Sequence, residues 1–86
     1  MKEDAVELLK PIYDRCIEGS RAISQNDVVN MTSTPWPPNR INNAIEYLDD
    51  LGHLKIEFAI GTTAGVRNFT ISGLNPSGID MIENRD

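Results

Sequence analysis

The chain has few side chains of the kinds that carry out catalysis or bind metals. Cys16 is the only cysteine and His53 the only histidine, so neither a disulfide within the chain nor a cysteine-rich metal site can form. Cys16 lies among apolar residues and is expected to be a buried core thiol. Asp49 and Asp50 are neighbours in a predicted helix, where adjacent side chains point about 100° apart, which does not suit a catalytic pair. With no nucleophile, base and acid in matching positions and no phosphate-binding glycine loop, the sequence predicts neither an enzyme nor a bound metal or cofactor.

Short polar side chains instead gather around a single arginine. Asn39, Asn42 and Asn43 surround Arg40, and Glu46 is the only other charged residue from 28 to 48. Amide and guanidinium groups present paired hydrogen-bonding atoms, so the cluster suits recognition of a polar partner. It equally suits a polar face in solvent, because asparagine is common near helix starts.

Helical spacing predicts the first element, a helix from Lys2 to Glu18 that Gly19 and Ser20 end. Its apolar stripe consists of Ala5, Leu8, Leu9, Ile12, Tyr13, Cys16 and Ile17. Pro11 interrupts the stripe. Because proline removes a hydrogen bond and clashes with the preceding turn, we expect a kink near Glu7 or a short first segment.

Capping signals predict a second helix from Gln25 to Met31, after a short extended segment at 21–23. Ser24 is a typical N-cap residue, and Asp27 lies three positions further on, where its carboxylate can complete a capping box. Ile23 and Val28 occupy the positions of a hydrophobic staple around this cap.

A turn rich in threonine and proline, Thr32–Pro38, leads into a third helix that runs from Pro38 to Leu51 and is closed by Gly52. We expect Trp36 to be buried between the second and third helices. The apolar stripe of the third helix consists of Ile41, Ala44, Ile45, Leu48 and Leu51.

Alternation of apolar and polar residues then predicts a β-hairpin with strands at Leu54–Ile60 and Asn68–Ser72. Matching Phe58 with Phe69 brings the apolar faces of the two strands together. In this register the side chains of Ile56 and Ile71 also pair.

The same register leaves Gly61–Val66 as the hairpin loop and places Arg67 opposite Ile60. After the hairpin, Asn75 is expected to cap a short last helix whose first residue is Pro76.

Charge is unevenly distributed along the 86 residues, which we expect to form one domain, 1–86. The net charge of −5 counts against a nucleic-acid partner, because contacts to phosphate supply much of the affinity of DNA-binding proteins. The acids concentrate in the first helix, whereas Arg67 is the only charged residue from 61 to 74. We therefore expect the acids to lie mostly away from a surface formed by the third helix and the hairpin.

Residues 41–54 resemble the third helix and first wing strand of the winged helix-turn-helix superfamily, in which a leucine, two polar residues, an apolar residue and a glycine precede the strand. Residues 69–71, followed by Gly78, Ile79 and Ile82, resemble the second wing strand and closing helix of many prokaryotic regulators of this group. The resemblance covers about residues 5–84. It implies an α+β fold with a three-helix core, a two-stranded hairpin wing and a short C-terminal helix.

In that superfamily the third helix enters the major groove and the wing contacts the flanking backbone, so the resemblance implies a DNA-binding transcriptional regulator. Arginine pairs with guanine and asparagine with adenine through two hydrogen bonds. The implied DNA-binding residues are Asn39, Arg40, Asn42 and Asn43 on the third helix and Thr62, Thr63 and Arg67 on the wing, with Asn68 next to them. Arg67 could instead pair with an acid such as Glu57.

Three further expectations concern partners and location. The same fold also serves as a protein-interaction module, and the net charge suits that alternative. Apolar residues of the first helix (Val6, Leu8, Leu9, Ile12 and Ile17) exceed what one small core needs, which favours a homodimer through that helix, with the last helix as the other possibility. The chain lacks a membrane-spanning apolar run and a secretory signal, so we expect it in the cytoplasm.

Overall fold

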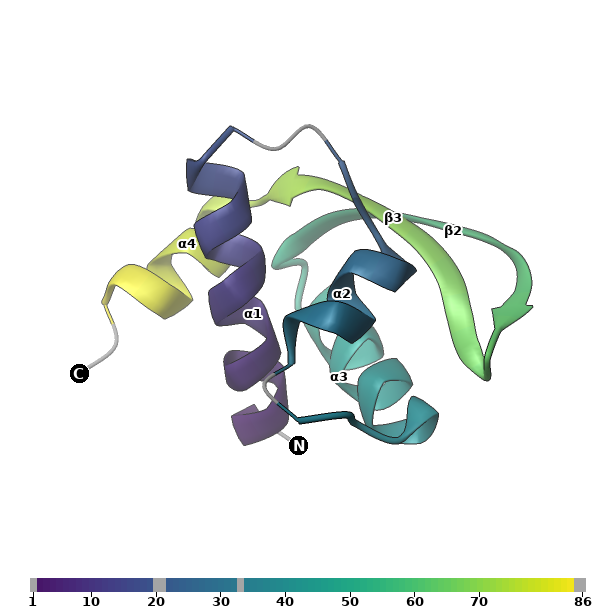
Figure 1. Cartoon of the computed structure of the whole chain (residues 1–86). Helices are drawn as coiled ribbons and strands as arrows, with labels where there is room; N and C mark the ends of the chain where they lie inside the picture. Colours follow the sequence, from purple (N-terminus) through teal and green to yellow (C-terminus); the bar gives the residue numbers. More distant parts are fainter. Residues whose placement is uncertain (1, 20–21, 33, 85–86) are drawn as a thin grey trace.

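The computed structural model describes residues 2–19, 22–32 and 34–84. Within them, four helices pack around a three-stranded antiparallel sheet, which confirms the predicted α+β class (Figure 1). The elements are α1 (Lys2–Ile17), β1 (Ile23–Ser24), α2 (Gln25–Met31), α3 (Pro38–Asp50), β2 (Leu54–Thr63), β3 (Val66–Leu74) and α4 (Pro76–Glu83).

Helix α1 is continuous, with 16 residues, and passes through Pro11. The predicted short first segment is therefore wrong. A proline inside a helix costs roughly 3 kcal/mol. Leu8, Leu9 and Ile12 are completely buried, and burying each such side chain contributes roughly 1.5–3 kcal/mol, which outweighs that cost. Ser20, expected to help end this helix, lies outside the described residues.

The start of α2 forms as predicted. The Ser24 hydroxyl accepts a hydrogen bond from the backbone N–H of Asp27 at 3.4 Å, and the Asp27 carboxylate accepts one from the backbone N–H of Ser24 at 3.1 Å. Ile23 and Val28, on either side of the cap, are both buried. The short extended segment before α2 is confirmed as β1, but Arg21 lies outside the described residues.

The turn into α3 also follows the prediction, although Ser33 within it is not among the described residues. Trp36 is buried, and Pro38 is the first residue of the helix. At the other end, Gly52 adopts a φ of 73°, the left-handed conformation that closes many helices. Leu51 was expected to be buried and is instead 47% exposed, because it is the C-cap residue, past the last buried turn.

The sheet has the strand order β1-β3-β2, so β3 is the central strand. The predicted pairs are confirmed: Phe58 faces Phe69 and Ile56 faces Ile71. Ile23 of β1 pairs with the other edge of β3, opposite Ile71, and thereby attaches the segment before α2 to the sheet.

The hairpin is longer than predicted, and the expected loop over 61–66 is wrong. Strand pairing continues as far as Thr63 and Val66, so only Ala64 and Gly65 form the turn. Both turn residues have positive φ angles, 53° and 83°, as a tight two-residue hairpin turn requires.

An irregularity in β2 changes the register near this turn. Residues 59–61 lie opposite Asn68 alone, which makes a β-bulge. As a result Arg67 pairs with Thr62, and the predicted pairing with Ile60 is wrong. The alternation placed Ile60 on the buried face of the strand, but the bulge turns its side chain fully into solvent.

Helix α4 packs closely against the start of β2. Asn75 is its N-cap residue as predicted, but the amide does not cap the helix: it donates to the carbonyl oxygens of Gly52 and Leu54, at 2.8 and 3.4 Å. A Cβ atom at Gly78 would lie only 2.4 Å from the carbonyl oxygen of His53, so only glycine permits this approach.

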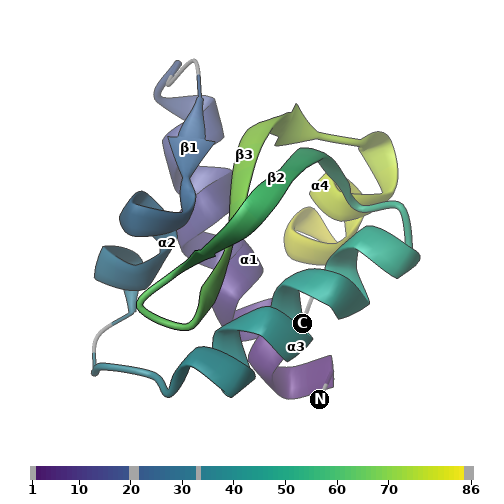
Figure 2. The ribbon, with the colours of Figure 1, turned by 90° about the vertical axis from the view of Figure 1, so that its right-hand side faces the viewer.

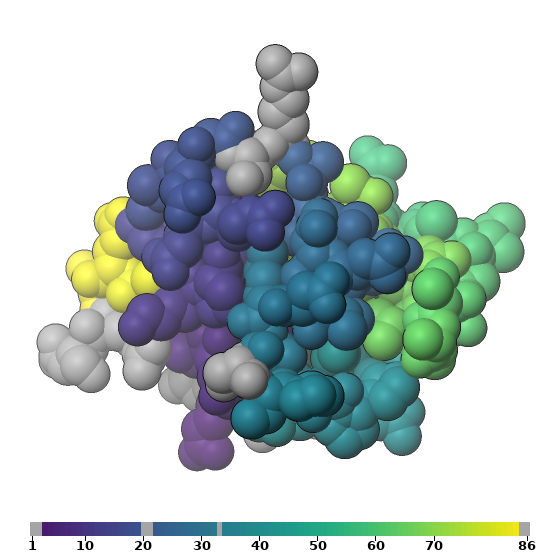
Figure 3. Space-filling view, viewed as in Figure 1, coloured from purple at the N-terminus to yellow at the C-terminus, as the bar shows by residue number. Residues whose placement is uncertain are grey.

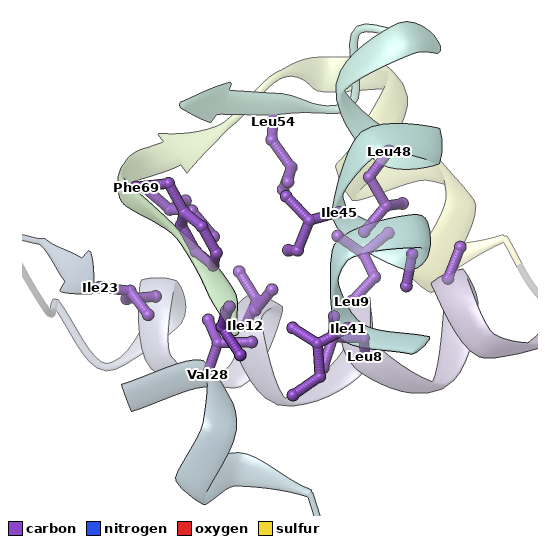
Figure 4. Packing of buried hydrophobic residues seen from close by; sticks show 14 of the residues in the cluster. Leu8, Leu9, Ile12, Ile23, Val28, Ile41, Ile45, Leu48, Leu54 and Phe69 are labelled. Atoms are coloured by element: carbon purple, nitrogen blue, oxygen red, sulfur yellow. The ribbon is translucent and has the colours of Figure 1, made fainter. Parts of the chain in front are cut away.

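The core is formed by side chains from both ends of the chain, which point toward one another between the helices and the sheet (Figure 4). Leu8, Leu9 and Ile12 belong to it, so the argument that they are surplus apolar surface for a dimer is wrong. Val6 is half-buried and Ile17 is 64% exposed. Among the described residues, no helix is long and apolar enough to span a membrane.

Candidate nucleic-acid interface

The solvent-facing ridge of α3 changes from amides to acids along its length. Asn39 and Asn43 are exposed on the first half of the helix, and Glu46 and Asp50 on the second. Spacings of three and four residues place all of them on one side of the helix. Neither Asn39 nor Asn43 makes a side-chain hydrogen bond to another described residue, so both amides are open to a partner.

Arg40 lies beside this ridge but is held by the protein itself. Its guanidinium Nη2 donates to the carboxylate of Asp4 at 2.8 Å and to that of Glu7 at 3.3 Å. The guanidinium carbon also lies 3.7 Å from the centre of the Trp36 ring, so the cation stacks on a buried indole. The structure therefore corrects the prediction of Arg40 as a free contact residue.

The expectation that acids lie away from α3 is wrong for Asp4 and Glu7. Because α1 packs along α3, the first turns of α1 place these two carboxylates beside the first turn of α3. The hydrogen bond from Arg40 holds the pKa of Asp4 below its usual value, and the same bond raises the pKa of Arg40. Both groups are therefore charged at neutral pH, and the cluster of one cation and two anions carries a net charge of −1.

An open hollow of about 360 Å³ lies at the start of α3. Its lining consists of Asp4, Pro37, Asn39, Arg40, Asn43 and Ala44. The Asp4 carboxylate therefore shares one surface depression with both open amides.

Asn42 joins α3 to the hairpin. Its amide Nδ2 donates to the carbonyl oxygen of Gly65, and its Oδ1 accepts from the backbone N–H of Arg67, both at 3.0 Å. A Cβ atom at Gly65 would lie 3.1 Å from the ring of Pro38, so the turn of the hairpin directly contacts the start of α3. Figure 2 shows this turn beside the first turns of the helix. Asn42 was predicted to contact DNA, but both ends of its amide are engaged within the protein.

The hairpin places Thr62 and Arg67 side by side near its turn. The guanidinium carbon of Arg67 lies 4.0 Å from the centre of the Phe58 ring, so Arg67 stacks on an aromatic ring of the same hairpin. The structure shows this stacking in place of the alternative ion pair with Glu57, and the arginine side of the hairpin remains exposed.

Hydrogen bonds made by the side chains of Thr63 and Asn68 support the bulge. The Thr63 hydroxyl donates to Oδ1 of Asn68 at 2.7 Å, and Nδ2 of Asn68 donates to the carbonyl oxygen of Ile60 at 3.3 Å. In the space-filling view the hairpin projects from the side of the molecule opposite α4 (Figure 3). Thr62 and Thr63 are both exposed, and Thr63 also helps to shape the hairpin through its hydrogen bond to Asn68.

The reactive side chains considered at the outset lie elsewhere. His53 Nδ1 is hydrogen-bonded to the Ser77 hydroxyl at 2.9 Å. Cys16 is half-buried and packs against the core, so it is less buried than the predicted core thiol, and its partial burial raises its pKa. In the described part of the chain, no three His, Cys, Asp or Glu side chains are grouped so that they could hold a metal ion.

Sequence reasoning missed the groups that engage the two arginines. Asp4 and Glu7 lie more than thirty residues before Arg40 in the chain, so no local spacing could have linked them. The helical pattern did place both acids on one helix, but their position beside α3 depends on how the helices pack. Phe58 under Arg67 was hidden by the two-residue register change at the bulge.

Comparison with known proteins gives no match: no family model, no curated protein and no solved structure is similar to this chain at a significant level.

Proposed function

We propose that this chain is a winged helix-turn-helix protein of the cytoplasm that binds duplex DNA as a transcriptional regulator. The element order, with a tight turn between α2 and α3 and a hairpin directly after α3, supports this assignment. In this proposal the first half of α3 enters the major groove, and β2 and β3 form the wing that contacts the flanking backbone.

The observation that carries the proposal is the ridge of open amides held in a fixed position relative to the hairpin. Asn39 and Asn43 lie where the first residues of an inserted helix meet base edges, and each amide can pair with adenine through two hydrogen bonds. Because Asn42 ties α3 to the hairpin, the two parts form one surface and need little ordering when DNA binds.

The structure refines the roles expected from the sequence. Asn39 and Asn43 are the proposed base-reading residues, and Thr62 and Arg67 are the proposed phosphate contacts. Asn42 positions the hairpin. This division leaves few cations for phosphate, so the proposal includes weak binding by one copy of the chain and useful affinity only when two copies bind together.

The test uses the four exposed asparagines of α2 and α3. Duplexes are first enriched from a random pool with the wild-type chain, and binding is then followed by fluorescence anisotropy at about 50 mM salt. The double variant Asn39→Ala/Asn43→Ala is expected to weaken binding about tenfold or more, because each lost bidentate contact costs ~1–3 kcal/mol. The matched control, Asn26→Ala/Asn30→Ala on α2, should change the affinity for these duplexes by less than about twofold. Salt-insensitive binding, or none at all, would refute the proposal.

A protein partner is the second candidate function, and two observations favour it. The net charge is −5, and Ile60 is a large apolar side chain that is completely exposed on the hairpin. Apolar contacts survive high salt, whereas binding to phosphate collapses. A partner retained on the immobilised chain at both low and high salt, and lost with Ile60→Ser, would support this function over DNA binding.

A further inference from the structure

The contact between α1 and Arg40 has a consequence for DNA binding, and the inference rests on the function proposed above. Arg40 lies at the end of α3 that would enter the groove, yet its guanidinium already has two carboxylate partners, at 2.8 and 3.3 Å. A phosphate that approaches this end of α3 meets the carboxylates of Asp4 and Glu7 together with the cation. With a net charge of −1, the cluster repels DNA where an isolated arginine would attract it.

We propose that Asp4 and Glu7 form an autoinhibitory contact that keeps Arg40 from DNA phosphates and lowers the affinity of the chain for duplex DNA. Arg40 is not buried by this contact: its side chain is 38% exposed, and those of Asp4 and Glu7 are 33% and 61% exposed. The guanidinium can therefore exchange its carboxylate partners for a phosphate without unfolding any element.

The surroundings of the cluster agree with this role. Stacking on Trp36 fixes the guanidinium in place, so removal of the acids leaves a cation that already faces the surface. The Asp4 carboxylate lines the same hollow as Asn39 and Asn43, so its charge acts directly on the proposed base-reading residues. The contact is present at neutral pH, because Arg40 lowers the pKa of Asp4.

The decisive variant is Asp4→Asn/Glu7→Gln, which removes both charges and keeps the shapes of the side chains. We expect it to bind a mixed-sequence duplex of about 20 base pairs at least tenfold more tightly than the wild type at low salt. Because one more cation then contacts phosphate, the slope of log K against log salt should steepen by about one. The single variant Glu7→Gln should show a smaller gain in affinity. It replaces the double variant in the test if thermal unfolding shows that the double variant is unstable.

The matched control is Asp49→Asn/Asp50→Asn, which changes the net charge equally at the far end of α3. Asp49 lies nine positions after Arg40 along the helix, a distance of about 14 Å. We expect this control to gain less than about threefold. Arg40→Gln should cancel the gain of Asp4→Asn/Glu7→Gln but change the binding of the wild type by less than about twofold.

The outcomes separate the inference from the function on which it rests. If the wild type binds DNA and Asp4→Asn/Glu7→Gln binds no better, or no better than the Asp49→Asn/Asp50→Asn control, the autoinhibitory contact is overturned and DNA binding stands. If only the variants without the two acids bind, the autoinhibitory contact is supported, and DNA binding by the wild-type chain is refuted. If no variant binds duplex DNA at low salt, both are refuted.

Discussion

The two arginines beside the proposed DNA surface each stack on an aromatic ring, but their other neighbours differ. Arg40 on α3 stacks on Trp36 at 3.7 Å, and Arg67 on the hairpin stacks on Phe58 at 4.0 Å. Only Arg40 also meets carboxylates, because α1 packs along α3 and does not reach the exposed side of the hairpin. The comparison shows that an arginine's position in a binding motif does not establish that its charge is free to bind.

The largest expected difference between the two regions is in how much the aromatic ring beneath each arginine contributes to the stability of the fold. Trp36 is buried, so Trp36→Ala should lower the free energy of unfolding by about 3–5 kcal/mol, which is a large part of the stability of a domain this small. Phe58 is half-buried, and Phe58→Ala should cost about 1–2 kcal/mol. Urea unfolding followed by circular dichroism measures both, with Trp36→Phe and Phe58→Leu as controls. Equal losses of unfolding free energy in the two alanine variants would contradict the difference in burial between Trp36 and Phe58.

The next largest effect is on DNA binding. Arg67→Gln should weaken binding to a mixed-sequence duplex about threefold to tenfold at low salt and reduce the salt slope by about one. Arg40→Gln should have less than about a twofold effect, because the guanidinium of Arg40 is already paired with Asp4 and Glu7 and is kept from phosphate. Fluorescence anisotropy over a series of salt concentrations compares the two directly. The reverse order would contradict the distinction between the arginines.

A smaller effect is expected on hydrogen exchange at the contact between α3 and the hairpin. Asn42→Ala removes two hydrogen bonds between α3 and the hairpin, including the one that the Arg67 backbone N–H donates. Hydrogen exchange of the Arg67 amide should accelerate about fivefold, because a typical hydrogen bond contributes ~1 kcal/mol. Asn43→Ala on the next residue is the control and should leave the exchange of this amide unchanged. An unchanged rate in Asn42→Ala would mean that other contacts fix the hairpin.

The smallest effect is on stability at acidic pH. The pKa of Asp4 is lowered in the folded state, chiefly by the hydrogen bond from Arg40. Its contact therefore stabilises the fold above the unfolded pKa of 3.8, and this stabilisation is lost as the pH falls through the lower folded value. The difference in Tm between the wild type and Asp4→Asn should accordingly shrink on acidification. Arg67→Gln should show no such dependence, since Arg67 stacks on Phe58 and forms no ion pair with the acids that the structure describes.

The sequence predicted the features that depend on neighbouring residues. Ser24 and Asp27 define the start of α2 within four positions, and Pro38 and Gly52 mark the ends of α3 without reference to the rest of the chain. These signals act through local backbone geometry, so they can be read from a short window.

The features that were missed depend on contacts that form only in the folded structure. The pairing of Arg40 with Asp4 spans 36 positions and exists only because α1 and α3 pack together. The bulge at 59–61 replaces the regular alternation of β2 where Asn68 can bond to the backbone of Ile60, and no propensity scale records such a contact. The class of fold and its elements were therefore predictable, whereas the charge state of the proposed surface was not.

The same bulge also affects how the molecule meets others of its kind. β2 is an outer strand of the sheet, and a straight strand of ten residues would offer neighbouring molecules a long row of backbone groups for pairing. The bulge breaks that row after Phe58, and the part that remains carries the exposed charged side chains of Lys55 and Glu57. An irregularity that shapes the hairpin thus also protects a small acidic protein from adding its sheet to that of another copy and growing into an aggregate.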